Sequence, residues 1–336
     1  MSPILLKLTF VPGLQEVVLA EIAQYPNVRV FETHTEKIYL DATSSLSDVG
    51  ALRSVLNVYA IRRGDRLNPS EISDHKSILG DLVDTALKND TFRTYHLSCA
   101  GSQSDEIRKI HHFITTRYKL VLAEEADMEM YIGKSLGVWE VGVRLTARPL
   151  SVRDYRVANI KGGLNPTTAY AMNTFCRLDS AKSYLNIFSG SGTLLVEAGI
   201  TNSELKLVGF DTNGTSIALA VKNVKKAGLL KSVTFHNADI ATRPALGKFD
   251  AIASDLPFGM QVSKGEDLRA LYAHFVEYSE SVLKAKGVLV VYTSEHALLE
   301  SLLAQSKFKI VKTLDLTVPT SGANNLHPKI VVCVFK

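Results

Sequence analysis

Residues 254–259 read SDLPFG and follow an apolar run at residues 249–253, FDAIA, which predicts a buried strand. Asp255 would stand at the carboxyl end of that strand, Pro257 would fix the backbone after it, and Phe258 would hold a flat apolar ring near the carboxylate. Such a group could hold a planar polar molecule by hydrogen bonding and stacking. Asp, Pro and Gly are also ordinary turn residues, so a plain surface turn is the alternative.

A second stretch, LNIFSGSGTLLVEAG, predicts a strand, a turn of small residues and the start of a helix. Small residues let the backbone approach a ligand closely, and the N-terminus of a helix favours anionic groups. A structural turn without a ligand is the alternative. The residues that we expect to contact a cofactor here are Ser189, Gly190, Ser191, Gly192 and Thr193.

Two further strand ends carry polar residues that complete this cofactor site. Asp211 ends the next predicted strand about twenty residues after the glycines, where a carboxylate can bind ribose hydroxyls. Asp239 and Ile240 follow the third predicted strand and are expected beside an adenine. Since the carboxyl ends of parallel strands meet at one edge of a sheet, these residues and Asp255 should converge on one crevice.

NAD and S-adenosylmethionine both fit this loop and Asp211. Leu195 occupies the place where the dinucleotide pattern has its third Gly or Ala, which weakens the NAD interpretation. The aromatic motif after the fourth strand and the predicted terminal hairpin favour a methyltransferase.

The elements that must position these residues alternate strictly from residue 164 onward. Strands are predicted at 184–188, 206–211, 233–238, 249–255 and 287–294, with helices between most of them. This alternation predicts a parallel sheet with helices on both faces. The last two strands, 308–318 and 329–336, are joined by a loop too short for a crossover helix and should pair antiparallel.

The first half predicts a mixed α+β region with two small modules. Strands at 5–11, 28–33, 37–42 and 57–63 alternate with helices near 13–25 and 46–56, and a polar joint follows at 64–74. A second unit has two helices around a strand at 94–101 and then two strands at 128–134 and 138–145.

Composition narrows the function classes. A chain of 336 residues favours two domains, and a formal net charge of +4 permits a nucleic-acid partner without requiring one. The three cysteines, Cys99, Cys176 and Cys333, lie far apart with no histidine cluster at ligand spacing, so we expect reduced thiols and no metal. The sequence shows neither a secretory leader nor a membrane span, so we expect a cytoplasmic protein with no membrane partner.

On these motifs the chain resembles the S-adenosylmethionine-dependent tRNA (guanine-N2)-methyltransferases that carry an N-terminal THUMP domain. The resemblance rests on LNPTTAYAM, SGSGTLLVEAG, GFDTN, NADI and SDLPFG, and in the first half on VPGLQEVVLAEI and WEVGVRLTARPLSVRDYRV. Two positions depart from the family pattern. Asn186 and Ile187 replace the usual Asp-Pro, and Leu256 replaces the usual Pro.

The resemblance implies a Rossmann-like class I methyltransferase domain, a parallel sheet with a terminal antiparallel strand, behind an α+β THUMP-containing region. It divides the chain into an N-terminal ferredoxin-like module (1–66), a THUMP RNA-binding module (67–150), a linker (151–163) and the methyltransferase domain (164–336). It also implies that Pro166 and Thr167 lie near the methionine end of the cofactor. A plain helix start, with Asn165 as cap, is the alternative for these two residues.

The implied reaction gives SDLPFG a role. Asp255 would accept a hydrogen bond from the guanine amine and stabilise the positive charge that develops on nitrogen, and the Leu256 carbonyl would accept the second hydrogen. Phe258 would stack on the flipped base, and Pro257 would keep the turn stiff.

Basic residues between the modules predict an RNA contact. The resemblance implies that the partner is tRNA or another structured RNA. The alternative is a solvated linker in which Asp154 pairs with a neighbour. The residues concerned are Arg148, Arg153, Arg156 and Lys161.

Other functions remain open at this point. They are an rRNA guanine-N2 methyltransferase, a non-catalytic RNA-binding protein that retains the fold, an oxidoreductase and a DNA adenine methyltransferase. We expect a monomer, and the need for an activator subunit stays open.

Overall fold

The computed structural model describes residues 3–64, 67, 75–101, 104–258, 267–320 and 324–336 of the chain. The chain divides into two compact units. The first comprises Met1–Phe10 and Val18–Ser151, and the second comprises Val11–Val17 and Val152–Lys336. Within the described ranges, no helix has the length and apolar character needed to cross a membrane.

The first unit is built on one sheet in the strand order β2-β3-β1-β4-β8-β7-β5-β6. Its strands pair antiparallel, except that β5 runs parallel to β6 and β7. The strands are β1 (Leu5–Thr9), β2 (Val30–Thr33), β3 (Lys37–Asp41), β4 (Asn57–Arg63), β5 (Thr94–Cys99), β6 (Val121–Leu122), β7 (Met128–Ser135) and β8 (Val138–Arg144). The helices in this part of the sequence are α1 (Gln15–Ile22), α2 (Leu46–Ala51), α3 (His75–Leu87) and α4 (Asp105–Tyr118).

Pairing of β4 with β8 joins strands from the two modules that we predicted at 1–66 and 67–150. Those modules therefore share one continuous sheet. The ferredoxin-like and THUMP identities of the two modules stay predictions.

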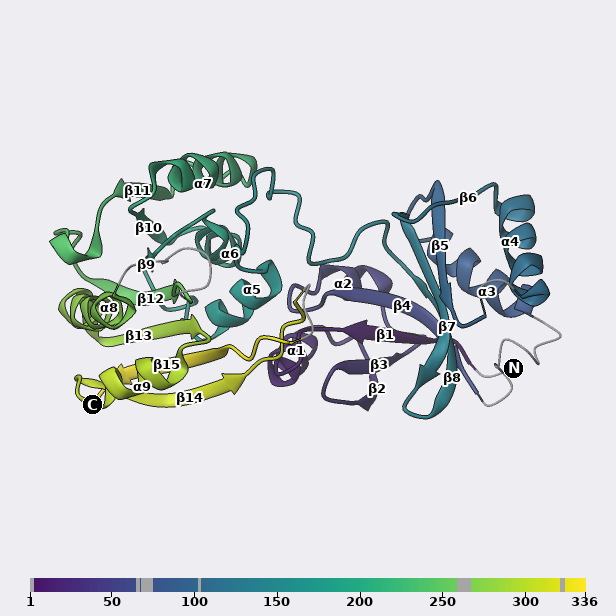
Figure 1. Cartoon of the computed structure of the whole chain (residues 1–336), viewed down its shortest axis with the longest axis horizontal. Helices are drawn as coiled ribbons and strands as arrows, with labels where there is room; N and C mark the ends of the chain where they lie inside the picture. Colours follow the sequence, from purple (N-terminus) through teal and green to yellow (C-terminus); the bar gives the residue numbers. More distant parts are fainter. Residues whose placement is uncertain (1–2, 65–66, 68–74, 102–103, 259–266, 321–323) are drawn as a thin grey trace. The chain divides into compact units, whose positions relative to one another are not determined.

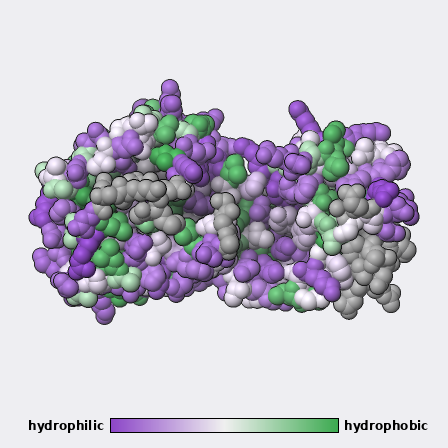
Figure 2. All heavy atoms as spheres, in the orientation of Figure 1, coloured by the Kyte–Doolittle hydropathy of each residue, from purple (hydrophilic) through white to green (hydrophobic). Residues whose placement is uncertain are grey.

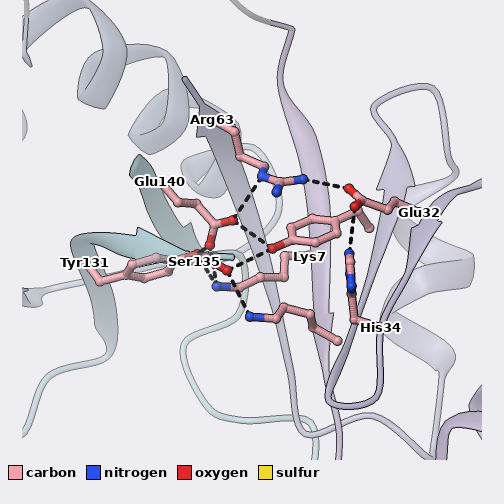
Figure 3. A network of polar contacts seen from close by, with 9 residues as sticks. Lys7, Glu32, His34, Arg63, Tyr131, Ser135 and Glu140 are labelled. Atoms are coloured by element: carbon pink, nitrogen blue, oxygen red, sulfur yellow. Dashed lines mark hydrogen bonds and ion pairs between the residues drawn. The ribbon is translucent and has the colours of Figure 1, made fainter. Parts of the chain in front are cut away.

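A polar network is buried on one face of this sheet (Figure 3). The Glu140 carboxylate is fully buried and accepts hydrogen bonds from Lys7 Nζ at 2.6 Å, from Tyr39 Oη at 3.0 Å and from Tyr131 Oη. Burial acts to raise the pKa of Glu140, but the charge of Lys7 and these hydrogen bonds outweigh it and lower the pKa. The ionised pair is thus compensated inside the unit.

The second unit has the strand order β11-β10-β9-β12-β13-β15-β14 (Figure 1). Strands β9 to β13 are parallel, and β15 is antiparallel to both β13 and β14, which confirms the predicted fold class. The strands are β9 (Ser183–Ile187), β10 (Lys206–Asp211), β11 (Val233–Asn237), β12 (Phe249–Asp255), β13 (Leu283–Thr293), β14 (Phe308–Asp315) and β15 (Lys329–Phe335).

The helices of this unit form two groups. In one group α5 (Pro166–Thr174) contacts α6 (Thr193–Thr201), which contacts α7 (Gly214–Lys226). In the other, α8 (Leu268–Val282) contacts α9 (His296–Ala304) and the 3₁₀ turn η2 (Ile240–Thr242). The main core lies where the strands meet the second group and includes Leu185, Phe210, Ile252, Tyr272 and Leu289.

Residues 151–163, predicted as a linker, are largely part of the second unit. Tyr155 is buried and packs against Val196 and Val224 on α6 and α7. The Ala158 backbone exchanges two hydrogen bonds with the buried Asn223 amide, at 2.9 and 2.8 Å. This segment is therefore held by side chains of the two helices that it crosses.

Figure 2 shows a face on which hydrophilic side chains predominate and hydrophobic ones form small separate patches. Among the exposed apolar side chains are Phe31 on β2 and Val121 on β6, the two edge strands of the first sheet. Scattered exposure of this kind is ordinary for a protein surface.

Candidate active site

The order of the second sheet reverses between β9 and β12, and this is where parallel sheets bind ligands. The two strand ends are tied together there by buried polar groups. Ser254 Oγ donates to the Ile187 carbonyl at 2.7 Å, and Asn186 Nδ2 donates to the Ile187 and Ala253 carbonyls at 3.1 and 3.0 Å. The loop after β9 and the turn after β12 are therefore held beside one another.

Asp255 ends β12, directly opposite Tyr292 of β13. Burial raises the pKa of its carboxyl from the usual 3.8 to about 7. The ionised form is thus poorly compensated in the free protein, which is characteristic of a carboxylate that acts on a ligand.

The turn after Asp255 is held at two points. Leu256 N–H donates to the Tyr292 carbonyl at 2.9 Å, and the Pro257 carbonyl accepts from Tyr272 Oη at 3.1 Å. The ring of Phe258 lies 5.7 Å from that of Tyr292, centroid to centroid, at an interplanar angle of 58°. Gly259, the last residue of the motif, lies outside the described residues.

The loop after β9 has the left-handed backbone that its small residues predict. Gly190 and Gly192 have φ values of 50° and 77°, and Phe188 before them has a φ of 57°, which is uncommon for an aromatic residue. A Cβ on Gly192 would lie 3.1 Å from the Ala220 Cβ, so this position has little room for a larger residue.

Hydroxyl groups gather around these glycines. Ser189, Ser191 and Thr193 are all buried, and the Ser191 and Thr193 hydroxyls lie 3.3 Å apart. Ser189 Oγ is buried without a hydrogen-bond partner among the described residues. An unpaired buried hydroxyl in a loop of this kind is consistent with a ligand that completes it.

Asp211 lies at the end of β10, next to this loop. Its Oδ2 accepts from Gly190 N–H at 2.9 Å, and its Oδ1 accepts from Asn213 N–H at 2.9 Å. A carboxylate has about four acceptor positions, so Asp211 can still bind hydroxyl groups. Asp239 is exposed and caps η2 by accepting from Ala241 N–H at 2.9 Å, and Ile240 is buried.

Pro166 and Thr167 begin α5, as the helix-start alternative predicts. Asn165 Oδ1 accepts from Thr167 N–H at 2.8 Å and from Thr167 Oγ1 at 2.7 Å. Their contact with a cofactor stays a prediction.

The basic residues between the modules differ in their surroundings. Arg153 Nε donates to the buried Glu197 carboxylate on α6 at 3.2 Å, and its side chain is only 10% exposed. Tyr155 Oη donates to the same carboxylate oxygen at 2.7 Å. Arg153 is thus committed to the second unit, whereas Arg148 and Lys161 are exposed. Their contact with RNA, like that of Arg156, stays a prediction.

Three residues that support the site were not among the predicted site residues, although the sequence singles out Asn186 as a departure from the family pattern. Asn186 bridges the ends of β9 and β12, Asn223 donates to the Ser191 carbonyl at 3.0 Å, and Tyr272 holds the Pro257 carbonyl. Asn186 stands inside an apolar strand run, which is a usable signal, whereas the roles of Asn223 and Tyr272 depend on contacts between distant segments. In the described ranges no cluster of three or more His, Cys, Asp or Glu could hold a metal ion.

Comparison with known proteins agrees with this geometry. The chain is 30% identical over 162 residues to a tRNA (guanine(6)-N2)-methyltransferase of Thermus thermophilus, covering 48% of each chain. It is 26% identical over 226 residues to the U6 snRNA (guanine-N(2))-methyltransferase THUMPD2 of Bos taurus, covering 64% of this chain and 43% of that one. The chain spans about a third to a half of the length of such curated relatives.

Among solved structures, TrmN from Thermus thermophilus superposes with a TM-score of 0.75 at 20% identity, covering 99% of this chain and 100% of that one. This likeness establishes a common fold. The family model for the RMKL-like methyltransferase domain matches residues 153–323, which is just over half of the sequence. The chain therefore belongs to the RMKL-like methyltransferase family.

Proposed function

We propose that the protein transfers a methyl group from S-adenosylmethionine to the N2 amine of a guanine in tRNA. The observation that carries the proposal is Asp255, a carboxylate with a raised pKa at the end of β12, beside a turn held rigid by two hydrogen bonds. Family membership supports the reaction class. The names of the relatives support RNA and the guanine amine as substrate.

The residues at this edge of the second sheet fit S-adenosylmethionine. Asp211 is available to ribose hydroxyls. The buried Ser189 hydroxyl, which has no hydrogen-bond partner in the described part of the chain, together with the left-handed glycines suits a ligand that lies against the loop. The N-terminus of α6 favours the carboxylate of the methionine part. When bound, the cofactor supplies a methyl group on a positively charged sulfur, which is already electrophilic.

The chain's own residues would then act on the amine. The guanine N2 lone pair is delocalised into the ring, so the amine is a weak nucleophile until its hydrogens are held. Asp255 would accept one N–H and the Leu256 carbonyl the other, which favours the bent geometry of the amine. As nitrogen gains the methyl group, its positive charge would face the Asp255 carboxylate, and this carboxylate can take the departing proton. Phe258 would stack on the base.

We also propose a substrate class, an oligomeric state and a location for the protein. The substrate would be a folded RNA bound without a membrane, and the protein would act as a monomer in the cytoplasm. An activator subunit would show itself as activity that appears only when cell extract is added to the purified chain.

In the decisive experiment, purified protein and methyl-labelled S-adenosylmethionine are incubated in three separate reactions, with total tRNA, with ribosomal RNA and with DNA. Nucleosides from each digest are then analysed by mass spectrometry. We expect N2-methylguanosine in tRNA, and a signal about a hundredfold lower with Asp255→Ala, because a preorganised charge partner is lost. N2-methylguanosine in ribosomal RNA alone would show that the substrate is ribosomal RNA and not tRNA. N6-methyladenine in DNA, or binding of NADH in place of S-adenosylhomocysteine, would refute the proposal.

A further inference from the structure

A chain of hydrogen bonds ends on the turn that carries the proposed reaction. Tyr272 on α8 is fully buried, and its Oη donates to the Pro257 carbonyl at 3.1 Å. The same Oη lies 2.6 Å from Thr293 Oγ1, which is also fully buried. Thr293 Oγ1 in turn accepts from Glu295 N–H at 2.9 Å.

The two ends of this chain determine the direction of every proton in it. A backbone N–H can only donate, and a carbonyl can only accept. Glu295 N–H must therefore donate to Thr293, the Thr293 hydroxyl to Tyr272, and the Tyr272 hydroxyl to Pro257. Each hydroxyl has one donor and one acceptor partner, so the orientation of both hydroxyl groups is fixed. In a buried setting the hydrogen bonds of such a series also strengthen one another.

The series of hydrogen bonds ends on the Pro257 carbonyl, and this matters for the conformation of the turn. The proline ring fixes φ of Pro257 but leaves ψ free, and ψ sets the direction in which the chain continues to Phe258. A bond to the Pro257 carbonyl removes that freedom. On the other side, Leu256 N–H is held by the Tyr292 carbonyl at 2.9 Å. The Leu256 carbonyl thus lies between two fixed points.

We propose that Tyr272 is a positioning residue for the reaction, acting with Thr293 to orient the Leu256 carbonyl and the Phe258 ring toward the substrate base. This inference rests on the proposed function, because it assigns the turn to the holding of a guanine amine. Neither residue need touch the substrate.

The same helix offers a matched control. Tyr278 also lies on α8, is buried, and donates from Oη to a proline carbonyl, that of Pro244, at 2.7 Å. Tyr278→Phe therefore removes the same kind of bond away from the turn. Tyr272→Phe should lower kcat about tenfold, since poor orientation of reacting groups raises the barrier. Its KM for RNA and its Kd for S-adenosylhomocysteine should stay within about twofold of wild type, and Tyr278→Phe should retain the wild-type kcat.

Variants of Thr293 test whether the connected hydrogen bonds act together. Thr293→Val breaks the series and should lower kcat as Tyr272→Phe does, whereas Thr293→Ser keeps a hydroxyl and should restore the rate. The double variant Tyr272→Phe/Thr293→Val should be no slower than the slower single variant, because both changes remove one chain. Equal kcat values for Tyr272→Phe and Tyr278→Phe, or additive losses in the double variant, would overturn the inference.

A measurement without RNA separates this inference from the proposed function. Hydrogen exchange at the Leu256 and Phe258 amides of the cofactor-free protein should rise in Tyr272→Phe and stay unchanged in Tyr278→Phe. If wild type methylates no guanine amine in any RNA, the proposed function fails, and the exchange rates still decide whether Tyr272 holds the turn. Equal exchange in both variants would refute that role, whatever the activity of the wild type.

Discussion

At the scale of single residues, Asp255 combines a raised carboxyl pKa with a charge that the proposed reaction requires. Its pKa of about 7 lies above that of an unfolded chain, so the folded state holds a proton that the unfolded state releases. Stability therefore falls as pH rises from about 4 to about 7. A charge that costs stability in the free protein becomes useful when a positive charge develops next to it.

The raised pKa of Asp255 leads to a prediction about the pH dependence of the reaction. The logarithm of kcat/KM should rise with a slope of about one up to an apparent pKa at or below about 7, because only the ionised carboxylate stabilises the developing charge. The positive charge of a bound sulfonium acts to lower that pKa, since it favours the carboxylate. The test is a pH–rate profile of wild type beside Asp255→Asn. The variant should show no such rise and, in thermal melts at pH 8, a higher Tm than wild type.

Asp211 supports a second prediction at this scale, which concerns binding rather than rate. Asp211→Asn keeps one acceptor oxygen but loses the charge and the second acceptor that hold the loop and, in the proposed site, would hold the ribose. Affinity for S-adenosylhomocysteine should fall about tenfold or more, the usual consequence of losing hydrogen bonds to a charged group. Calorimetry measures this directly, with Asp239→Asn as a comparison at a more exposed carboxylate. Wild-type affinity in Asp211→Asn would remove the residue from the cofactor site.

At the scale of elements, the segment before α5 is anchored through a buried ion pair. Arg153 Nε and Tyr155 Oη both donate to Glu197 on α6, whose carboxylate is fully buried. α6 is also the helix that follows the glycine loop. The segment and the glycine loop are therefore both attached to α6.

We predict that Arg153→Ala destabilises the protein by about 3 kcal/mol, because a buried carboxylate loses its cation. Adding Glu197→Gln should recover part of that loss, since the uncompensated charge is then gone. Chemical denaturation of the two variants and of Lys161→Ala, an exposed control expected to change stability by less than about 0.5 kcal/mol, provides the comparison. If Arg153→Ala is as stable as the control, the ion pair contributes little to stability and the prediction is wrong.

At the scale of the whole molecule, the proposed function assigns cofactor binding to the second unit and RNA binding to both units. The residues that we propose for the cofactor lie at strand ends of the second unit, whereas a folded RNA offers phosphates over a much larger area. Cofactor binding should accordingly depend on the second unit alone, and RNA affinity on both.

Two fragments test this division. A fragment of residues 152–336, which is the second unit without its Val11–Val17 segment, should bind S-adenosylhomocysteine within a few-fold of the full chain but have a KM for tRNA at least about tenfold higher, because most phosphate contacts are lost. A fragment of residues 161–336 lacks Arg153 and Tyr155, so Glu197 is left buried without them and the Tm should be clearly lower. Full activity of the shorter fragment on tRNA would contradict both parts of the prediction.

The sequence alone was sufficient for the second sheet and for the position of its polar residues. Strand periodicity, strict alternation with helices and the rule that parallel strands share one carboxyl edge place Asp211, Asp239 and Asp255 together. These features are local or follow from general topology, so they can be read without coordinates.

Tertiary structure alone decided the features that depend on contacts between distant segments. The helix predicted at 46–56 ends at Ala51 because the buried Glu21 carboxylate accepts the Arg53 and Ser54 N–H groups, at 2.7 and 2.9 Å. In the same way, Glu197 and Asn223 hold the supposed linker, and Tyr272 reaches Pro257 across fifteen positions of sequence. No periodicity records such pairings, since each depends on where folding brings two remote side chains.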